Sequence, residues 1–213
     1  MSGLFEEIIY RDFEEKDIDE VALILESTWW EDLAPKGLEK EVGIIDLANY
    51  ARRVTFARVA EYGGHVVGVI AARAGDSDQE TKDYWKTFSD DACAKLKSQL
   101  GDELNRLTGY YDFEERVHNK MHEESEHDLS YELVLFAVSS EARGKGVGTS
   151  LLRFAVEYLK GQGAQSAFLY TDSTCDWQYY EKRGMERTAE YKSTPDEVAD
   201  GRPEELYIYS CNL

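Results

Sequence analysis

The clearest hydrophobic pattern lies in the last third of the chain, where short apolar runs alternate with helical spacing. Residues 129–138 are apolar at nearly every position, which is typical of a strand buried on both faces. Along residues 149–160 the apolar side chains recur four positions apart and line one side of a helix, which Gly161 and Gly163 end. The other elements predicted here are strands over residues 166–171, 185–192 and 206–212, a helix over residues 174–183, and a turn over residues 195–203.

The first 74 residues predict a strand, two helices and a hairpin of strands. These elements are a strand over residues 5–11, a helix that begins at Asp17, a helix over residues 38–53, and strands over residues 55–62 and 65–73. Acidic side chains occupy the first turn of the earlier helix, where the helix dipole favours them, whereas Gly43 weakens the later helix. Gly63 and Gly64 readily adopt positive φ angles, so they predict a tight turn between the two strands.

Residues 75–128 form a polar, acidic segment between this hairpin and the buried strand. Apolar residues recur in it at helical spacing, and Trp85, Tyr110, Tyr111 and Phe113 favour packing over disorder. We expect two or three helices that form a hairpin or a lid. The whole chain, residues 1–213, is predicted to be a single domain with this segment as a helical insertion.

The amino-acid composition narrows the possible binding partners of the protein and its cellular compartment. The 213 residues include 43 acidic and 24 basic side chains, so the formal net charge is −19. Such a surface repels phosphate backbones and anionic lipids, so we expect no binding to nucleic acid or to a membrane. Three widely spaced cysteines without a Cys-x-x-Cys pair favour a reducing compartment. The longest apolar runs have the length of strands, and we expect a soluble, cytoplasmic protein.

A glycine-rich loop over residues 143–148 carries the strongest chemical signal. Gly144, Gly146 and Gly148 lack the side chains that would keep a phosphate away from the backbone, and the loop leads into a helix. The N–H groups and the dipole at the start of a helix favour an anion, so the loop predicts a cradle for a diphosphate. A Walker A loop needs Ser or Thr after Gly-Lys, and Gly146 stands there instead. The spacing also differs from the Gly-x-Gly-x-x-Gly dinucleotide fingerprint.

Two segments together resemble one known family. Arg143, Gly146 and Gly148 match the Arg/Gln-x-x-Gly-x-Gly/Ala loop of the GNAT (Gcn5-related N-acetyltransferase) superfamily. Residues 177–185, Trp-Gln-Tyr-Tyr-Glu-Lys-Arg-Gly-Met, resemble that family's Phe-Tyr-Glu-Lys-x-Gly-Phe segment, with Met185 in place of the usual Phe. The order of predicted elements also fits outside residues 75–127. The resemblance implies an α/β (α+β) fold whose mixed, mostly antiparallel sheet carries the insertion between its third and fourth strands.

The resemblance also implies where acetyl-CoA binds. The family holds this cosubstrate between its two central parallel strands, here residues 133–138 and 166–171. The pyrophosphate then lies on the N–H groups of the loop, the pantetheine arm pairs with the end of the first strand, and the Val138 N–H polarises the thioester carbonyl. Ser173 and Asp176 stand near positions where the family often has Asn or Ala. The implied cofactor-binding residues are Phe136, Ala137, Val138, Arg143, Gly144, Lys145, Gly146, Val147, Gly148, Thr149, Ser173 and Tyr180.

Two catalytic residues follow from the same resemblance. Tyr180 occupies the position of the family's general acid, which protonates the departing thiolate of CoA. The alternative is that it packs the helix against the sheet, which is the interpretation we favour for Tyr179. Glu132 stands at the start of the central strand, where related enzymes often keep a glutamate, and it is the candidate general base. Asp172 and Glu61 are alternative bases, and each of the three carboxylates can also be an ordinary surface group.

Three further groups are open to both a functional and a structural interpretation. His118, His122 and His127 lie in an acidic stretch, but without His-Glu-x-x-His they favour a solvated helix face, and no metal site is expected. Trp29 and Trp30 line an acceptor pocket or belong to the core. Cys175 lacks a basic neighbour in sequence, which argues against a nucleophile.

The sequence therefore predicts an N-acetyltransferase that moves an acetyl group directly to an amine of a small molecule or a peptide. The acidic balance favours a cationic acceptor such as a polyamine, an aminoglycoside-like amine or a basic peptide terminus. One alternative is a non-catalytic acyl-CoA-binding or regulatory module of the same fold. Another is an interaction protein whose insertion docks a partner. For the enzyme, we expect the helical insertion either to cover the acceptor site or to mediate formation of a homodimer.

Overall fold

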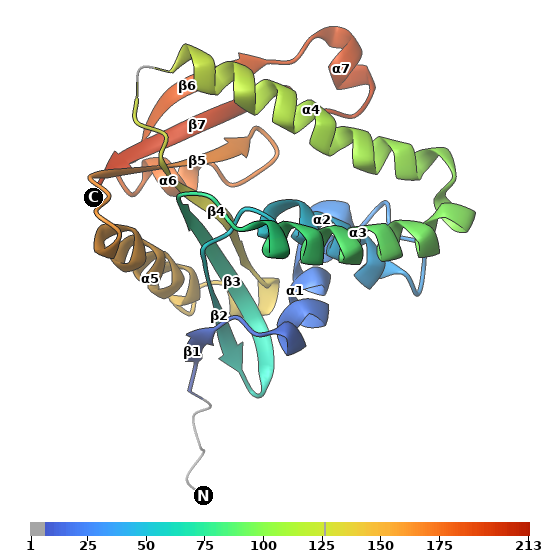
Figure 1. The fold of residues 1–213 in the computed structure, drawn as a ribbon, viewed down its shortest axis with the longest axis horizontal. Helices are drawn as coiled ribbons and strands as arrows, with labels where there is room; N and C mark the ends of the chain where they lie inside the picture. The colour runs from blue at the N-terminus through green and yellow to red at the C-terminus, as the bar shows by residue number, and fades with distance from the viewer. Residues whose placement is uncertain (1–6, 126) are drawn as a thin grey trace, which may run out of the picture.

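A computed structural model describes residues 7–125 and 127–213, and it shows one mixed sheet with helices on both faces (Figure 1). Seven strands are found within these residues, in the order β1-β2-β3-β4-β5-β7-β6, and β4 and β5 are the parallel neighbours among them. The mixed, mostly antiparallel sheet is thus confirmed. The strands are β1 Ile9–Asp12, β2 Phe56–Tyr62, β3 His65–Ala74, β4 Tyr131–Val138, β5 Ser166–Asp172, β6 Glu186–Lys192 and β7 Glu205–Asn212.

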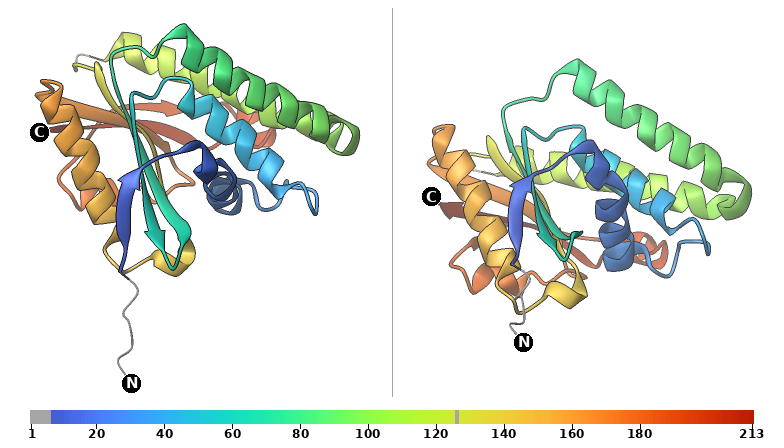
Figure 2. Two further views of the ribbon diagram at one scale, coloured as in Figure 1. Left: turned by 60° about the horizontal axis from the view of Figure 1, so that its bottom comes forward. Right: turned by 90° about the horizontal axis from the view of Figure 1, so that it is seen from below.

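The helices divide between the two faces of the sheet. Helices α5 and α6 pack on one face and the first four helices on the other (Figures 1 and 2). A π-helical turn over Glu26–Trp30 follows the first helix. The helices are α1 Ile18–Leu25, α2 Glu39–Ala51, α3 Gln79–Leu100, α4 Asp102–Glu124, α5 Val147–Gly161, α6 Gln178–Glu181 and α7 Pro195–Ala199. No helix among the described residues is long and apolar enough to cross a membrane.

Glycines explain one tight turn and one close helix contact in the first half of the chain. Gly63 and Gly64 have φ angles of 61° and 82°, and they form the predicted turn between the antiparallel strands β2 and β3. Gly43 lies in α2 against the backbone of α1, where an added Cβ would collide with the carbonyl of Ala22. The glycine that weakens the helix in sequence therefore lets the two helices pack together.

The segment between β3 and β4 is a hairpin of two long helices, α3 and α4, as the spacing predicts. Phe113, Val117 and Met121 recur every fourth position along α4 and are buried. They pack on the face of the sheet formed by β5 and β7, through Phe168 and Ile208. Helix α4 therefore covers the half of the sheet that α1 and α2 leave free (Figure 1).

Three predicted boundaries need correction. The helix predicted over residues 174–183 is reduced to α6, because the Asp172 carboxylate accepts hydrogen bonds from the N–H and the hydroxyl of Thr174 at 2.7 and 2.6 Å and holds a turn there. The turn predicted over residues 195–203 contains α7, which a capping box of Thr194 and Glu197 starts. The first strand begins at Ile9, and the part of that prediction on residues 5–6 lies outside the described residues.

Candidate active site

The two parallel strands at the centre of the sheet separate toward their carboxyl ends. Within the described chain their register pairs Glu132 of β4 with Phe168 of β5. On the other side of β4, the N–H of Ser139 donates to the carbonyl of Val67 at 2.9 Å. Because backbone groups alternate in direction along a strand, Phe136 and Val138 present their N–H and C=O groups toward β5. Ala137, predicted together with them, points its backbone groups toward β3.

The glycine loop adjoins this end of β4. Gly144 and Gly146 have φ angles of 76° and 79°, and nothing lies within 4 Å of a Cβ added to either. Both positions therefore require glycine for the backbone conformation and leave open space beside the loop. Val147 anchors the loop in the core, and the N–H of Ser150 is the first that bonds within α5. The N–H groups just before it are free to hold an anion at the positive end of the helix.

Two buried hydroxyl groups next to the loop lack a partner within the described residues. They belong to Ser139, at the end of β4, and to Tyr179 on α6. A Cβ at Gly148 would lie 3.3 Å from the hydroxyl of Tyr179 and 3.1 Å from the ring of Phe136. Buried polar groups without partners are rare in folded proteins. The open loop and these two hydroxyls fit a phosphate- and amide-bearing ligand such as acetyl-CoA.

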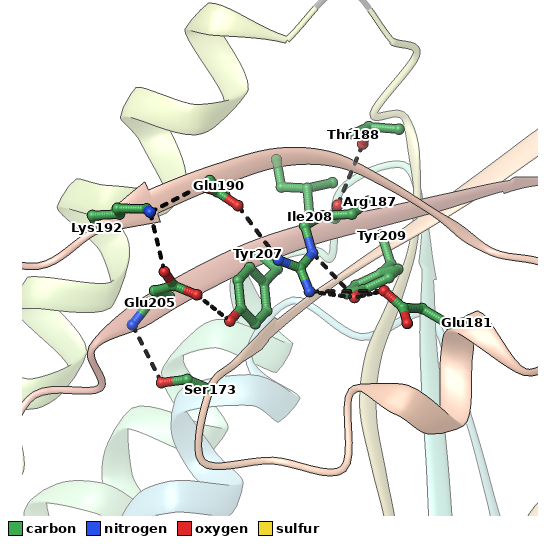
Figure 3. A network of polar contacts seen from close by, with 10 residues as sticks. All are labelled: Ser173, Glu181, Arg187, Thr188, Glu190, Lys192, Glu205, Tyr207, Ile208 and Tyr209. Atoms are coloured by element: carbon green, nitrogen blue, oxygen red, sulfur yellow. Dashed lines mark hydrogen bonds and ion pairs between the residues drawn. The ribbon is translucent and has the colours of Figure 1, made fainter.

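The short helix α6 carries both tyrosines and is held against β7 by Arg187. Its guanidinium donates to the hydroxyl of Tyr209 at 3.1 and 3.0 Å, and that hydroxyl donates to Glu181 of α6 at 2.9 Å (Figure 3). The Tyr180 ring packs beside Tyr209, and burial raises the pKa of its phenol. The phenol is therefore protonated at neutral pH, as a proton donor must be.

Ser173 directly follows β5 and belongs to the same network of polar contacts. Its hydroxyl accepts from the N–H of Glu205 at 3.2 Å, and its own N–H donates to the carbonyl of that residue (Figure 3). The structure thus shows Ser173 tying the end of β5 to β7. Nearby, burial raises the pKa of the Cys175 thiol to about 12, which keeps it protonated and unreactive.

Glu132 is buried and bound on both carboxylate oxygens. One oxygen lies 3.0 Å from a guanidinium nitrogen of Arg53, and the other lies 2.9 Å from one of Arg73. Only 3% of its side chain is exposed, and the two arginines compensate its charge. Neither oxygen can take a proton without weakening an ion pair. Glu61 is bound elsewhere, 2.9 Å from Arg11 on the edge strand β1.

A group that we call the carboxylate–aromatic cluster lies where α2 and α4 meet the carboxyl end of β5. Its members are Asp46, Glu114 and Asp172 with Trp30, Tyr50, Tyr110 and Tyr111. Each carboxylate accepts from one tyrosine hydroxyl, at 2.8 Å for Asp46 and Tyr111, 3.4 Å for Glu114 and Tyr50, and 3.5 Å for Asp172 and Tyr110. Trp30 and Asp172 are candidates predicted from the sequence, whereas no sequence pattern indicated Asp46 or Glu114.

Burial makes two of these carboxyl groups titrate near neutral pH. The pKa of Asp46 is raised to about 7 by desolvation, against the opposing effects of Tyr111 and of the nearby Trp30. The pKa of Glu114 is raised to about 8 by desolvation and by the charges of Asp46 and Asp172. Carboxyl groups with such pKa values can take up or release protons under physiological conditions.

A cavity of about 250 Å³ adjoins the cluster and is lined by Tyr111 and Glu114. His118 also lines it and stacks on Tyr170, with 3.7 Å between the ring centroids. Burial and the nearby Arg53 lower the pKa of His118 to about 3, so its imidazole is neutral. His122 lines the same cavity. In the part of the chain that the structure describes, no three His, Cys, Asp or Glu side chains are grouped to hold a metal ion.

Comparisons with known proteins agree on one fold. A family model described as the acetyltransferase (GNAT) family matches residues 23–185. Ard1 from Thermoplasma volcanium is 18% identical, with 97% of both chains covered and a TM-score of 0.53. Aminoglycoside 6'-acetyltransferase type Ii is 16% identical, with 96% of both chains covered and a TM-score of 0.54.

A third similar structure is the ribosomal-protein-S18-alanine N-acetyltransferase from Escherichia coli. It is 14% identical, with 97% of this chain and 94% of that chain covered and a TM-score of 0.53. Identities this low show the shared fold. Among curated proteins, no relative in sequence was found.

Proposed function

Because the chain belongs to the acetyltransferase (GNAT) family and is an acetyl-CoA-dependent N-acetyltransferase, we propose that it transfers the acetyl group directly to a primary amine. The observation that carries the proposal is the open glycine loop at the start of α5, next to the outward-facing backbone groups of Phe136 and Val138. The N–H groups over residues 146–149 hold the pyrophosphate, because those of Arg143 and Lys145 donate within the loop. The exposed side chains of Arg143 and Lys145 add positive charge there.

The end of β4 serves the pantetheine arm and the thioester. Phe136 and Val138 offer alternating donors and acceptors, which an extended amide chain can pair with as a strand does. The Val138 N–H stabilises the negative charge that grows on the carbonyl oxygen during acyl transfer. The hydroxyls of Tyr179 and Ser139, unpartnered in the described residues, complete the polar lining.

Acyl transfer needs one proton donor and one proton acceptor. The amine nitrogen attacks the thioester carbon, the carbon–sulfur bond breaks, and Tyr180 donates its phenolic proton to the leaving thiolate. The new amide nitrogen gives up its surplus proton to the Tyr180 phenolate, which restores the phenol. The incoming ammonium group must first lose a proton. We assign that proton to Glu114, because the two arginines occupy both oxygens of Glu132 and the pKa of Glu114 lies near 8. Glu132 then positions Arg53 and the start of β4.

Replacement of Gly146 by Val tests the loop. The side chain would fill the open space beside the loop, and we expect affinity for acetyl-CoA to fall at least tenfold in isothermal titration. Gly64→Val is the matched control, since Gly64 also has a positive φ angle, 82°, and open space around it but lies in the β2–β3 turn. Equal affinities of the two variants for acetyl-CoA would contradict the proposal.

A panel of amines separates the enzyme from a module that only binds acyl-CoA. The enzyme releases free CoA thiol when an acceptor amine is added, whereas the module binds acetyl-CoA and releases none. Tyr180→Phe provides the internal control, because it should retain acetyl-CoA binding and lose most of the thiol release.

A further inference from the structure

The carboxylate–aromatic cluster contains more negative charge than the surrounding chain compensates. Within residues 7–125 and 127–213, no Lys, Arg or His side chain forms an ion pair with Asp46, Glu114 or Asp172. The arginines that line the adjoining cavity are already paired. Arg53 and Arg73 bind Glu132, and Arg52 lies 3.8 Å from Glu115. The three carboxylates of the cluster therefore have no ion-pair partner of their own among the described residues, and the nearby charge of Arg53 only partly opposes the raised pKa of Glu114.

Asp46 shows that the cluster lacks a partner as it stands. Its residue is 1% exposed, one carboxylate oxygen accepts from Tyr111, and the other, Oδ2, has no hydrogen-bond partner among the described residues. The buried indole N–H of Trp30 lies near Asp46 and lowers its pKa, but it forms no hydrogen bond of regular geometry. Trp30 therefore satisfies this carboxylate only weakly, and a cationic N–H donor that enters the cluster would bind it more strongly.

The aromatic side chains of the cluster suit a cation as well as the carboxylates do. Trp30 and Tyr110 meet edge to face with 5.4 Å between their ring centroids, and Tyr110 meets Tyr111 in the same way at 5.9 Å. Rings of this kind attract ammonium groups through their negatively charged faces. The hydroxyls of Tyr110 and Tyr111 meanwhile fix the carboxylates of Asp172 and Asp46 in place.

The position of the cluster connects it to the acyl-transfer site. Asp172 is the last residue of β5, the strand that separates from β4, and its carboxylate accepts from Tyr110 of α4. At the other end, Glu114 and Tyr111 line the cavity of about 250 Å³. Among the described residues Asp46 and Asp172 do not line this cavity, so a cation that enters it first meets Glu114, the proposed proton acceptor.

We propose that the acetyl acceptor is a small amine with at least two positive charges, of the diamine or polyamine type, and that Asp46, Glu114 and Asp172 bind it. This inference rests on the proposed function and adds the substrate class. A zwitterion with a carboxylate at its far end must compete with Glu115 and Glu132 for the arginines of the cavity. The net charge of −19 attracts the same class of acceptor.

Proton release is a signature of this mode of binding. Asp46 and Glu114 have pKa values of about 7 and 8, so in the empty protein they hold protons for part of the time at pH 7. A bound cation favours their charged forms and lowers both pKa values. Binding of a diamine at pH 7 should therefore release protons.

Three probes of matched length test the inference by isothermal titration of the full-length protein: 1,4-diaminobutane, butylamine and 4-aminobutanoate. We expect the diamine to bind at least tenfold more tightly than the other two. Its apparent enthalpy should also depend on the ionisation enthalpy of the buffer, which reports proton release. Equal affinity for 4-aminobutanoate would overturn the inference in favour of a zwitterionic acceptor.

Glu114→Gln removes one charge of the cluster without changing the size of the side chain. We expect it to weaken diamine binding at least tenfold, to reduce proton release and to leave acetyl-CoA affinity unchanged. Glu123→Gln, at an exposed position of α4 outside the cavity lining, is the matched control and should bind the diamine as the unmodified protein does. Unchanged diamine affinity in Glu114→Gln would overturn the assignment, and circular dichroism of both variants monitors their folding.

The inference and the proposed function fail in different ways. If the diamine binds tightly to the cluster but no CoA thiol is released from acetyl-CoA, the proposed function fails and the binding site stands. If thiol is released equally fast with butylamine or 4-aminobutanoate, the enzyme stands and the diamine class is wrong.

Discussion

Tyr179 and Tyr180 are adjacent in sequence, yet their hydroxyl groups lie in different surroundings. The hydroxyl of Tyr179 is buried near Gly148 without a partner among the described residues, whereas Tyr180 packs beside Tyr209. The family pattern identifies the second tyrosine through Glu181 and Gly184, which follow it at the expected spacing. The pattern says nothing about Tyr179, because only the tertiary structure brings this side chain next to the glycine loop.

Substitution of each tyrosine by Phe separates the two roles. Tyr180→Phe removes the proton donor, so kcat should fall at least tenfold while KM for acetyl-CoA changes little. Tyr179→Phe removes a buried unpartnered hydroxyl, so the free energy of unfolding should rise by about 1 kcal/mol in urea titration. Steady-state kinetics of both variants is the check, and a larger loss of kcat in Tyr179→Phe would reverse the assignment.

Glu114 makes the stability of the fold depend on pH in a defined direction. Its pKa is about 8 in the folded chain and near 4.5 when exposed, so between these values the unfolded state binds fewer protons than the folded state. Stability from this group therefore falls as the pH rises from about 4.5 to 8. Glu114→Gln should accordingly stabilise the protein at pH 8, by up to about 4 kcal/mol, and have little effect at pH 4.5. Urea titrations at the two pH values measure this, and an equal effect at both would contradict the raised pKa.

At the scale of elements, the sequence was most informative where one local rule decides the structure. Gly63 and Gly64 determine the β2–β3 turn, and the four-residue apolar spacing of α5 appears in the structure as predicted. The helix predicted over residues 174–183 was wrong at its start, because Asp172 bonds to Thr174 and competes with helical hydrogen bonds. Such competition requires a carboxylate within hydrogen-bond distance of the backbone at the start of the helix. The spacing of apolar residues does not reveal whether one is present.

The carboxylate–aromatic cluster shows why half of the candidate site was missed. Tyr110, Glu114, His118 and His122 recur every fourth position and form one stripe of α4, beside the apolar stripe that packs on the sheet. In sequence this stripe resembles a solvated helix face. Only the packing of α4 against α2 and β5 brings it next to Asp46 and Asp172, which lie more than 50 residues away on either side.

Helix α4 therefore determines the position of the cluster. Met121 is 1% exposed and belongs to the apolar stripe that packs on β5 and β7. Met121→Ala should lower the free energy of unfolding by about 2 to 4 kcal/mol. Because α4 carries Glu114 while α5 carries the glycine loop, diamine binding should weaken and acetyl-CoA binding should persist. The exposed Glu124→Ala is the control on the same helix, and equal losses of both affinities in Met121→Ala would show that the two sites are not separable.

For the whole molecule, the net charge of −19 acts on the two substrates with opposite signs. A diamine is attracted over distances beyond contact, while the cationic side chains Arg143 and Lys145 attract the phosphates of acetyl-CoA only near the loop. Salt screens interactions beyond about 8 to 10 Å at physiological ionic strength. We therefore expect kcat/KM for 1,4-diaminobutane to fall several-fold between about 20 and 200 mM salt. The value for butylamine should fall less, because it carries one charge, and equal slopes for the two amines would show that the overall field does not select the acceptor.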